Sequence, residues 1–386
     1  RWQQADGLGR LALVRTYGWT GSSWGMEGEV ALTHDVMGNL VRVAQAGGLG
    51  GTTFSYDLGG RKTAMSDGDP GTRRYAYDRQ GKLVWQADAR NAVSCLRYDK
   101  LGRVSSKVVA YNATCSVPGA TVTYSYDAGH GGKSRSRGQL TSVAYADGRW
   151  EKVLTYDAQG LLASERVKIA GAPQLYTTHY GYDSYRRPSA TTYPDGEQVS
   201  VGYNSRGLAA WLRSTWHGML VDGATAGGVG YDAAGRAVSL RLGGSVWRTL
   251  VYAPENQADN QGGRLSEVRA GSAAGGATLL QVRYGYDSYG NVRTIADGTG
   301  NHTFGYDSQN RLTTGYGRSY SYDAAGRLVG YEGASLGYNT LQPVHAVKGS
   351  AYAYDANGNL LRRPGQALVW DVEHRLAAVS GSVGGL

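Results

Sequence analysis

Two short motifs contain residue types that could perform hydrolysis. Residues 21–25 (GSSWG) match the G-x-S-x-G elbow of a serine hydrolase, which needs a strand before the serine and a helix after it. The next residues, MEGEVALTHD, instead have the pattern of a strand. Residues 297–300 (DGTG) are similar to one loop of an aspartic protease, but such a site needs two carboxylates that share a proton, and no second loop matches. We therefore expect no catalytic residues, and a hairpin turn at 297–300.

A third stretch, DANGN from Asp355, begins like a calcium-binding loop. The EF-hand template fails there, because its sixth position is leucine rather than glycine and its twelfth is glutamine rather than glutamate. The seven histidines are scattered along the chain without the spacing of metal ligands. We expect a polar turn here, with weak surface binding of Ca²⁺ as the alternative, and no metal site or cofactor.

The composition disfavours nucleic acid and membrane as partners. The net charge is +9 and 32 of the 40 basic residues are arginines, most of them isolated beside a glycine turn. A nucleic-acid surface needs clustered charge, and the one cluster, Lys133, Arg135 and Arg137, has the Gly and Ser content of an exposed loop. No apolar stretch reaches the roughly 18 residues of a transmembrane helix. The chain begins with Arg1 and has no signal-peptide pattern, so we expect a piece of a longer protein.

One sequence motif, Y-D-x-x-G-[RNK]-L, recurs along the chain in about sixteen copies, mostly about twenty to thirty residues apart. The copies that retain its Tyr, Asp and Gly are Tyr56-Asp57…Gly60, Tyr77-Asp78…Gly81, Tyr98-Asp99…Gly102, Tyr156-Asp157…Gly160, Tyr231-Asp232…Gly235, Tyr286-Asp287…Gly290, Tyr322-Asp323…Gly326 and Tyr354-Asp355…Gly358. In three degenerate copies Arg186, Asn310 and His374 replace the glycine. We expect one continuous repeat array over 1–386.

The repeated residues have the chemistry of a turn. Asp at the first position accepts backbone N–H groups through its short carboxylate. Gly three residues later can adopt the positive φ that a type I turn with a G1 bulge requires. Asn310 is the next-best residue for that conformation, whereas Arg186 and His374 fit less well, so we expect altered turns at those two positions. The Tyr, Asp and Gly of each copy are thus predicted to be structural.

The residues around each turn alternate as in a strand. Pairs such as Tyr75 and Tyr77 place two rings on one strand face, and a short apolar strand follows the turn, so each copy is predicted to be a β-hairpin. A lone hairpin is marginal in water, so hairpins in series must pair side by side. The predicted fold class is all-β: antiparallel hairpins forming one long twisted sheet. Tyrosine suits a thin wall, because its hydroxyl can reach water or a carbonyl.

Cys95 and Cys115 are predicted to form a disulfide. Cys95 lies on the strand that leads into the Tyr98-Asp99 turn, and the return strand brings Cys115 back to the same end of the hairpin. A bridge needs Cα atoms within roughly 7 Å. It would close a loop of about twenty residues and contribute roughly 3 kcal/mol. Two free thiols are the alternative, and a disulfide would fit an exported protein.

The recurrent Y-D-x-x-G-R-L motif resembles the YD-repeat (RHS-repeat) proteins. These include bacterial Rhs polymorphic toxins, the B and C components of insecticidal Tc toxins, wall-associated proteins of Gram-positive bacteria and animal teneurins. The resemblance covers essentially the whole chain, and it implies a β-sheet strip that spirals into a strip or hollow shell, which in the toxins encloses a C-terminal toxic domain. The Asp-Pro-x-Gly core motif where bacterial members cleave themselves is absent from the sequence. No self-cleavage and no separate toxin or core-protease domain are therefore implied.

The resemblance implies a non-enzymatic structural region of a secreted or cell-surface bacterial Rhs-type protein. Its shell would encapsulate a polypeptide cargo and contact adjacent repeat segments of the full-length protein. The alternative is an extracellular adhesion, matrix or filament-forming protein, because open sheet edges invite self-association by strand addition. The faces of Trp211, Trp216 and Trp247 could then bind glycans. Neither interpretation requires a cofactor, nucleic acid or a membrane span.

Overall fold

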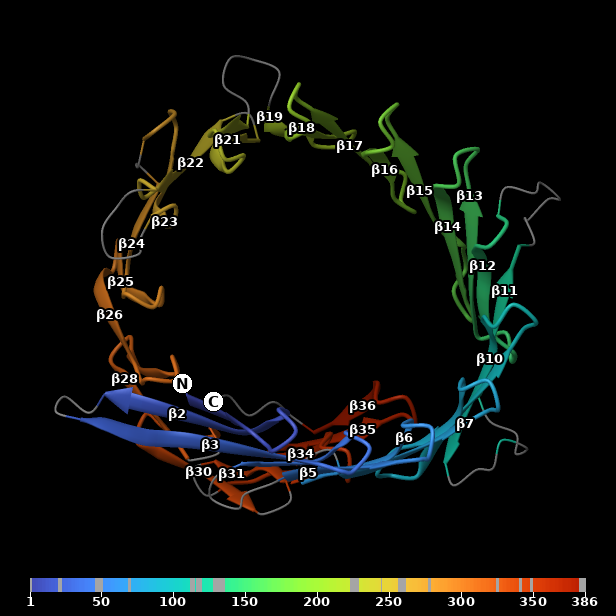
Figure 1. Cartoon of the computed structure of the whole chain (residues 1–386). Coiled ribbons are helices and arrows are strands. Elements are labelled where there is room, and N and C mark those ends of the chain that lie inside the picture. The colour runs from blue at the N-terminus through green and yellow to red at the C-terminus, as the bar shows by residue number, and fades with distance from the viewer. Residues whose placement is uncertain are drawn as a thin grey trace. The chain divides into compact units, whose positions relative to one another are not determined.

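The computed structural model of the chain describes residues 2–19, 23–45, 51–68, 71–111, 115, 120–127, 136–222, 229–243, 245–255, 262–276, 279–323, 326–339, 342–347 and 350–381. Every helix or strand assigned within these ranges is a β-strand (Figure 1). The chain divides into two compact units: one combines Arg1–Val122 with Gly305–Leu386, and the other is Thr123–Phe304.

The first unit contains β1 (Trp2–Ala5), β2 (Leu11–Trp19), β3 (Trp24–His34), β4 (Leu40–Gln45), β5 (Gly51–Tyr56), β6 (Lys62–Asp67), β7 (Gly71–Tyr77), β8 (Leu83–Ala87), β9 (Ala92–Tyr98) and β10 (Val104–Tyr111). It also contains β27 (Leu312–Gly315), β28 (Arg318–Tyr322), β29 (Leu328–Tyr331), β30 (Ala334–Asn339), β31 (Gln342–Val347), β32 (Ser350–Ala351), β33 (Ala353–Tyr354), β34 (Leu360–Arg363), β35 (Gln366–Trp370) and β36 (Leu376–Ser380).

The second unit contains β12 (Leu140–Tyr145), β13 (Trp150–Tyr156), β14 (Leu162–Ile169), β15 (Tyr176–Tyr182), β16 (Pro188–Thr192), β17 (Gln198–Tyr203), β18 (Ala209–Ser214), β19 (Gly218–Asp222), β20 (Gly230–Tyr231), β21 (Ala237–Leu242), β22 (Val246–Tyr252), β23 (Leu265–Gly271), β24 (Leu280–Tyr286) and β25 (Val292–Asp297). Two strands have residues in both units, β11 (Ala120–Tyr126) and β26 (Gly300–Tyr306).

Consecutive strands pair antiparallel, as the repeat predicts. β5 pairs with β6, β6 with β7, β7 with β8, β8 with β9, and β9 with β10. The register shifts where a strand meets a repeat turn, for example between Ala76 and Tyr77, which is the bulge expected for this kind of turn. The predicted fold class, an all-β series of antiparallel hairpins, is confirmed.

The prediction of altered turns at Arg186 and His374 is wrong. Their φ angles are 65° and 62°, within a few degrees of Asn310 at 59° and close to Gly60 at 72°. The backbone N–H of each also donates the turn hydrogen bond expected of the glycine, that of Arg186 to the carbonyl of Asp183 at 2.9 Å and that of His374 to the carbonyl of Asp371 at 3.2 Å. A side chain in the left-handed region costs about 1–2 kcal/mol. The other hydrogen bonds of the turn offset that cost, which a residue-by-residue judgement overlooks.

The tips of the repeat turns project into solvent. The residues at the second turn position include Val36, which is 96 % exposed, and Leu58, which is 104 % exposed. The first and last turn positions are instead tied to the backbone, as described below. Within each repeat turn, the first and last positions therefore stabilise the fold, and the second position does not.

Candidate functional site

Each repeat turn is closed by its aspartate. Between β5 and β6, Oδ1 of Asp57 accepts the backbone N–H groups of Gly59 and Arg61 at 2.9 and 3.0 Å. Its other oxygen, Oδ2, accepts Nε of Arg61 at 2.7 Å. Asp99 makes the same bonds to Arg103 between β9 and β10. Both oxygens of the recurrent carboxylate therefore hold the turn.

These contacts lower the pKa of turn aspartates such as Asp57 and Asp232. The pKa of Asp57 lies below its ordinary value chiefly because the backbone N–H of Arg61 binds the charged form, helped by the Arg61 side chain. The side chain of Arg236 is the main cause of the lowered pKa of Asp232 in the second unit. A carboxylate with a lowered pKa is a weak base, so the arrangement suits structural support and not proton transfer.

In the turns that carry Arg10 and Arg61, the arginine also bonds to the next turn. Nη1 of Arg61 donates to the carbonyl of Asp78 at 3.0 Å, and Nη1 of Arg10 donates to that of Asp35 at 3.0 Å. The Arg61 guanidinium also lies 5.3 Å from the ring centroid of Tyr77, the tyrosine of the next repeat, within cation–π range. We term this series of turn-to-turn bonds the arginine ladder.

The tyrosine of the repeat joins neighbouring hairpins through its hydroxyl. Tyr77 donates to the carbonyl of Lys62 at 2.8 Å, and Tyr98 to that of Leu83 at 2.7 Å. The same bond to the preceding hairpin, between 2.6 and 3.1 Å long, is made by Tyr56, Tyr156, Tyr182, Tyr203, Tyr231, Tyr252, Tyr286 and Tyr322. Phenylalanine cannot make this bond, so these ten positions favour tyrosine over phenylalanine.

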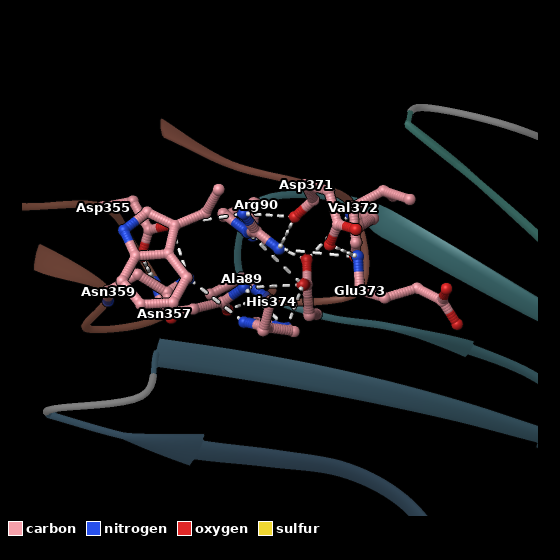
Figure 2. A network of polar contacts seen from close by, with 12 residues as sticks. Ala89, Arg90, Asp355, Asn357, Asn359, Asp371, Val372, Glu373 and His374 are labelled. Carbon is pink, nitrogen blue, oxygen red and sulfur yellow. Dashed lines mark hydrogen bonds and ion pairs between the residues drawn. The ribbon is translucent and has the colours of Figure 1, made fainter. Parts of the chain in front are cut away.

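A different contact joins hairpins that are far apart in sequence. Residues 88–91, between β8 and β9, lie against the turns 355–358 and 371–374 of the sheet β33–β36 (Figure 2). The backbone N–H of Ala89 donates to Oδ1 of Asn357 at 3.0 Å. We term the turns 88–91, 355–359 and 371–374 together the seam.

Carboxylate and imidazole groups surround this contact. Nδ2 of Asn357 donates to Oδ2 of Asp88 at 2.5 Å, and Nε2 of His374 lies 3.1 Å from the same oxygen. Asn359 approaches the other nitrogen of His374, with Nδ2 and Nδ1 3.1 Å apart (Figure 2). Side chains from the other two turns of the seam, Asn357 and His374, thus converge on the Asp88 carboxylate.

Arg90 is the central residue of the seam, and only 10 % of its side chain is exposed. Nη1 lies 3.3 Å from the Asp355 carboxylate, and Nη1 and Nη2 both donate to the carbonyl of Asp371 at 3.3 Å. Nη2 also donates to the carbonyl of Val372 at 3.4 Å (Figure 2). A guanidinium stays charged when buried, so these oxygens offset the cost of removing it from water.

A cavity of about 310 Å³ lies beside the seam. Tyr75 and Gln86 line it from the sheet, and Glu373 and His374 line it from the turn 371–374. Nζ of Lys107 on β10 bonds to Oε1 of Glu373 at 2.9 Å. This ion pair between two lining residues joins β10 to the turn 371–374, so it stabilises the seam.

The predicted pair Cys95 and Cys115 is bonded in the structure, with the sulfur atoms 2.08 Å apart and the Cα atoms 5.6 Å apart. Cys95 belongs to a small buried cluster with Ala87 and Val93, and Trp85 packs against that cluster. Ala87 immediately precedes Asp88, the first residue of the seam. Cys95 pairs with Trp85 across the β8–β9 hairpin, whose turn carries Arg90.

The second unit contains a buried charged group at Glu267, which is 6 % exposed. Arg269 forms an ion pair with it, Gln281 Nε2 donates to Oε1 at 2.6 Å, and Arg283 Nε lies 3.1 Å from the same oxygen. The hydrogen bond from Arg269 is the main reason that the pKa of Glu267 falls to about 2. This carboxylate is thus a fixed anion that pairs strands β23 and β24.

No protein-family model and no curated protein matches the chain. Solved structures do match. The chain superposes on a Photorhabdus luminescens Tc holotoxin pore with a TM-score of 0.82 and 16 % identity, over 97 % of this chain and 21 % of that one. It superposes on a TcdB2–TccC3 crystal structure with a TM-score of 0.81 and 16 % identity, over 97 % of this chain and 22 % of that one. For TcdB2–TccC3 without its hypervariable C-terminal region, the TM-score is 0.78 and the identity 17 %, over 99 % of this chain and 22 % of that one.

The chain has the YD-repeat fold. The predicted resemblance to YD-repeat proteins is thereby confirmed, with the Tc toxins as the members that match. The chain spans about a fifth of the length of those toxin chains. The sequence identity is low, so what the two share is architecture.

The motifs considered for catalysis have structural places in the YD-repeat fold. Ser23 directly precedes β3, so a strand follows it as predicted, while Gly21 and Ser22 lie outside the described residues. Asp297 pairs with Gly300 in the β25–β26 hairpin, as predicted. Thr299 donates to Oδ1 of Asp297 from its N–H at 2.8 Å and its hydroxyl at 2.6 Å, which closes that turn.

Other predicted features are placed as follows. Lys133 and Arg135 lie outside the described residues. Within the described ranges, no group of three or more His, Cys, Asp or Glu could hold a metal ion, and no helix is long and apolar enough to cross a membrane. The ring of Trp211 fills the space where Gly202 lacks a side chain, and Trp216 is 55 % exposed. The glycan site stays a prediction.

Sequence reasoning missed the seam. The turn 88–91 lacks the tyrosine and glycine of the repeat, yet Asp88 and Asn91 stand at the first and fourth positions, and Asn91 has a φ of 59°. Asparagine tolerates that conformation, so a search for Asp-x-x-[Gly/Asn] would have found the turn. The partners of Arg90 gave no comparable signal, because they lie more than 260 residues away.

Proposed function

We propose that the chain is a non-enzymatic structural repeat segment that walls off a polypeptide cargo in a secreted or cell-surface protein. Residues 1–386 act as one continuous repeat array, and adjacent repeat segments of the same protein complete the wall. The observation that carries this proposal is the use of the recurrent Asp, Arg and Tyr side chains. Asp57, Arg61 and Tyr77 all bond to the backbone of their own or a neighbouring hairpin.

Two further observations support the proposal. The architecture matches Tc toxin structures over 97 % of the chain, and the resemblance to that family implies a shell that encloses a C-terminal toxic domain. The Cys95–Cys115 disulfide is compatible with an oxidising compartment, as in a secreted protein. The adhesion and self-association alternatives stay predictions.

Small-angle scattering tests the wall. A solid globule of 386 residues has a radius of gyration of about 21 Å. A wall of paired hairpins with solvent on both faces has a larger value, and a measured radius of about 21 Å would contradict the proposal.

A protease assay tests enclosure of a cargo. An unfolded reporter polypeptide is fused after Leu386, and its half-life in trypsin is compared with that of the same reporter fused to a compact β-protein of equal length. We expect slower cleavage beside the repeat chain. Equal half-lives in the two fusions would argue against enclosure.

A further inference from the structure

The residue at the fifth turn position explains why Arg90 is in the seam. At Arg10 and Arg61, the guanidinium bonds to its own aspartate at 2.7 Å and to the carbonyl of the next turn's aspartate at 3.0 Å. In the turn 355–359 that residue is Asn359, whose Nδ2 still bonds to Asp355 at 2.7 Å. Successive turns are two strand spacings apart, about 9.6 Å. An asparagine side chain is too short to reach that far, so the ladder position at Asp371 is open to another donor.

Arg90 takes that position from a non-neighbouring hairpin. It bonds to the Asp371 carbonyl with both Nη atoms at 3.3 Å, and its Nη1 lies 3.3 Å from the Asp355 carboxylate. These are the two partners that a ladder arginine at 359 would have. The contacts are longer than the 2.7 and 3.0 Å bonds of Arg61, so an arginine within the repeat would compete well for them.

We propose that the turns 355–359 and 371–374 form a docking site for an arginine-bearing turn, which Asn359 opens and Arg90 occupies. The seam can part while the β8–β9 hairpin and the sheet β33–β36 both stay folded. The turn 88–91 is closed by its own bond from Asp88 N–H to the Ala92 carbonyl at 3.0 Å, and β33–β36 pair with one another. This deepens the proposed function and rests on it in one respect: the seam is the place where the wall would open.

The substitution Asn359→Arg tests the docking site. The new guanidinium supplies both contacts from within the repeat and displaces Arg90. The readout is amide hydrogen exchange at Ala89, whose N–H bonds across the seam to Asn357. We expect this amide to exchange about tenfold faster or more, as for loss of a bond network to a charged group. The amides of β9 and β34 should keep their rates, and the thermal midpoint should stay the same or rise.

The matched control is Asn39→Arg. Asn39 has the same place in the turn 35–39, where its Nδ2 bonds to Asp35 at 2.9 Å, and this turn is not part of the seam. We expect no change at Ala89. Arg90→Ala should speed exchange at Ala89 as Asn359→Arg does.

Two results would overturn the docking site. One is an Ala89 amide that exchanges at the parent rate in folded Asn359→Arg. The other is faster exchange throughout the β8–β9 hairpin and the sheet β33–β36, which would mean that the seam cannot part without unfolding the strands beside it. A chain that fails to protect a fused reporter while its seam responds as described would refute the proposed function and leave the docking site standing.

Discussion

Replacement of Tyr286 by phenylalanine tests whether the repeat tyrosines join neighbouring hairpins through their hydroxyls. The Tyr286 hydroxyl donates to the carbonyl of Leu265 at 2.7 Å. Phenylalanine keeps the ring, whose centroid lies 5.4 Å from the guanidinium carbon of Arg264, and removes only that donor. The matched control is Tyr284→Phe, which makes the same chemical change on the same face of β24.

The expected loss follows from one bond. A neutral hydrogen bond contributes about 0.5–1.5 kcal/mol net, and the Leu265 carbonyl would be left without this donor. We therefore expect the free energy of unfolding to fall by about 1 kcal/mol in Tyr286→Phe and by less than about 0.5 kcal/mol in the control. Adding Tyr156→Phe, whose bond to Leu140 is also 2.7 Å, should double the loss, because the two sites share no partner.

The assay is urea denaturation together with hydrogen exchange along β23 and β24, because a repeat array does not have to unfold in one step. Alkaline pH gives an independent readout. Burial raises the pKa of Tyr286 above its ordinary 10.0. That contribution to stability is therefore complete below pH 10 and is lost as pH rises through the folded-state pKa. The phenylalanine variant should lack this alkaline loss. Equal losses in Tyr286→Phe and Tyr284→Phe would refute the reasoning.

Three further predictions concern separate parts of the chain. Replacing Cys95 and Cys115 by serine should lower the free energy of unfolding by about 3 kcal/mol, measured by denaturation, because the bridge closes a loop of twenty residues; an unchanged midpoint would mean that the disulfide is dispensable. Glu267→Gln should cost up to about 3 kcal/mol at neutral pH, since the pKa falls from 4.5 to about 2. This contribution is present above pH 4.5 and is lost as pH falls towards 2, so parent and variant should converge in acid, and a constant gap would count against it. Arg186→Gly should raise the thermal midpoint, by the equivalent of about 0.5–1 kcal/mol, because it relieves a positive φ of 65°; a lower midpoint would show that the contacts of the arginine matter more.

The sequence predicts the local structure well because the turn is local. Asp57 and Gly60 stand three residues apart, and the bonds that close the turn run within five residues. Hairpins and their antiparallel pairing follow, because a hairpin needs a neighbour. The failure at Arg186 and His374 has the same origin. Propensity describes one residue at a time, whereas the stability of a turn depends on all of its hydrogen bonds together.

The seam was beyond sequence reasoning for a physical reason. Arg90 is one arginine among 32, and nothing in its neighbourhood distinguishes it from an exposed residue. Its partners Asp355 and Asp371 are repeat aspartates like the others. What sets them apart is the short side chain of Asn359, and that matters only once the spacing between turns is known.

The exposed turn tips have a consequence for the history of such a chain. Val36 and Leu58 are almost wholly in solvent, and the bonds that build the turn come from the residues around them. Substitutions at such positions remove no bond of the turn, so the side chains at the turn tips can change one at a time. Selection can therefore build a binding surface for a partner on these regularly spaced positions, while the hairpins beneath them stay unchanged.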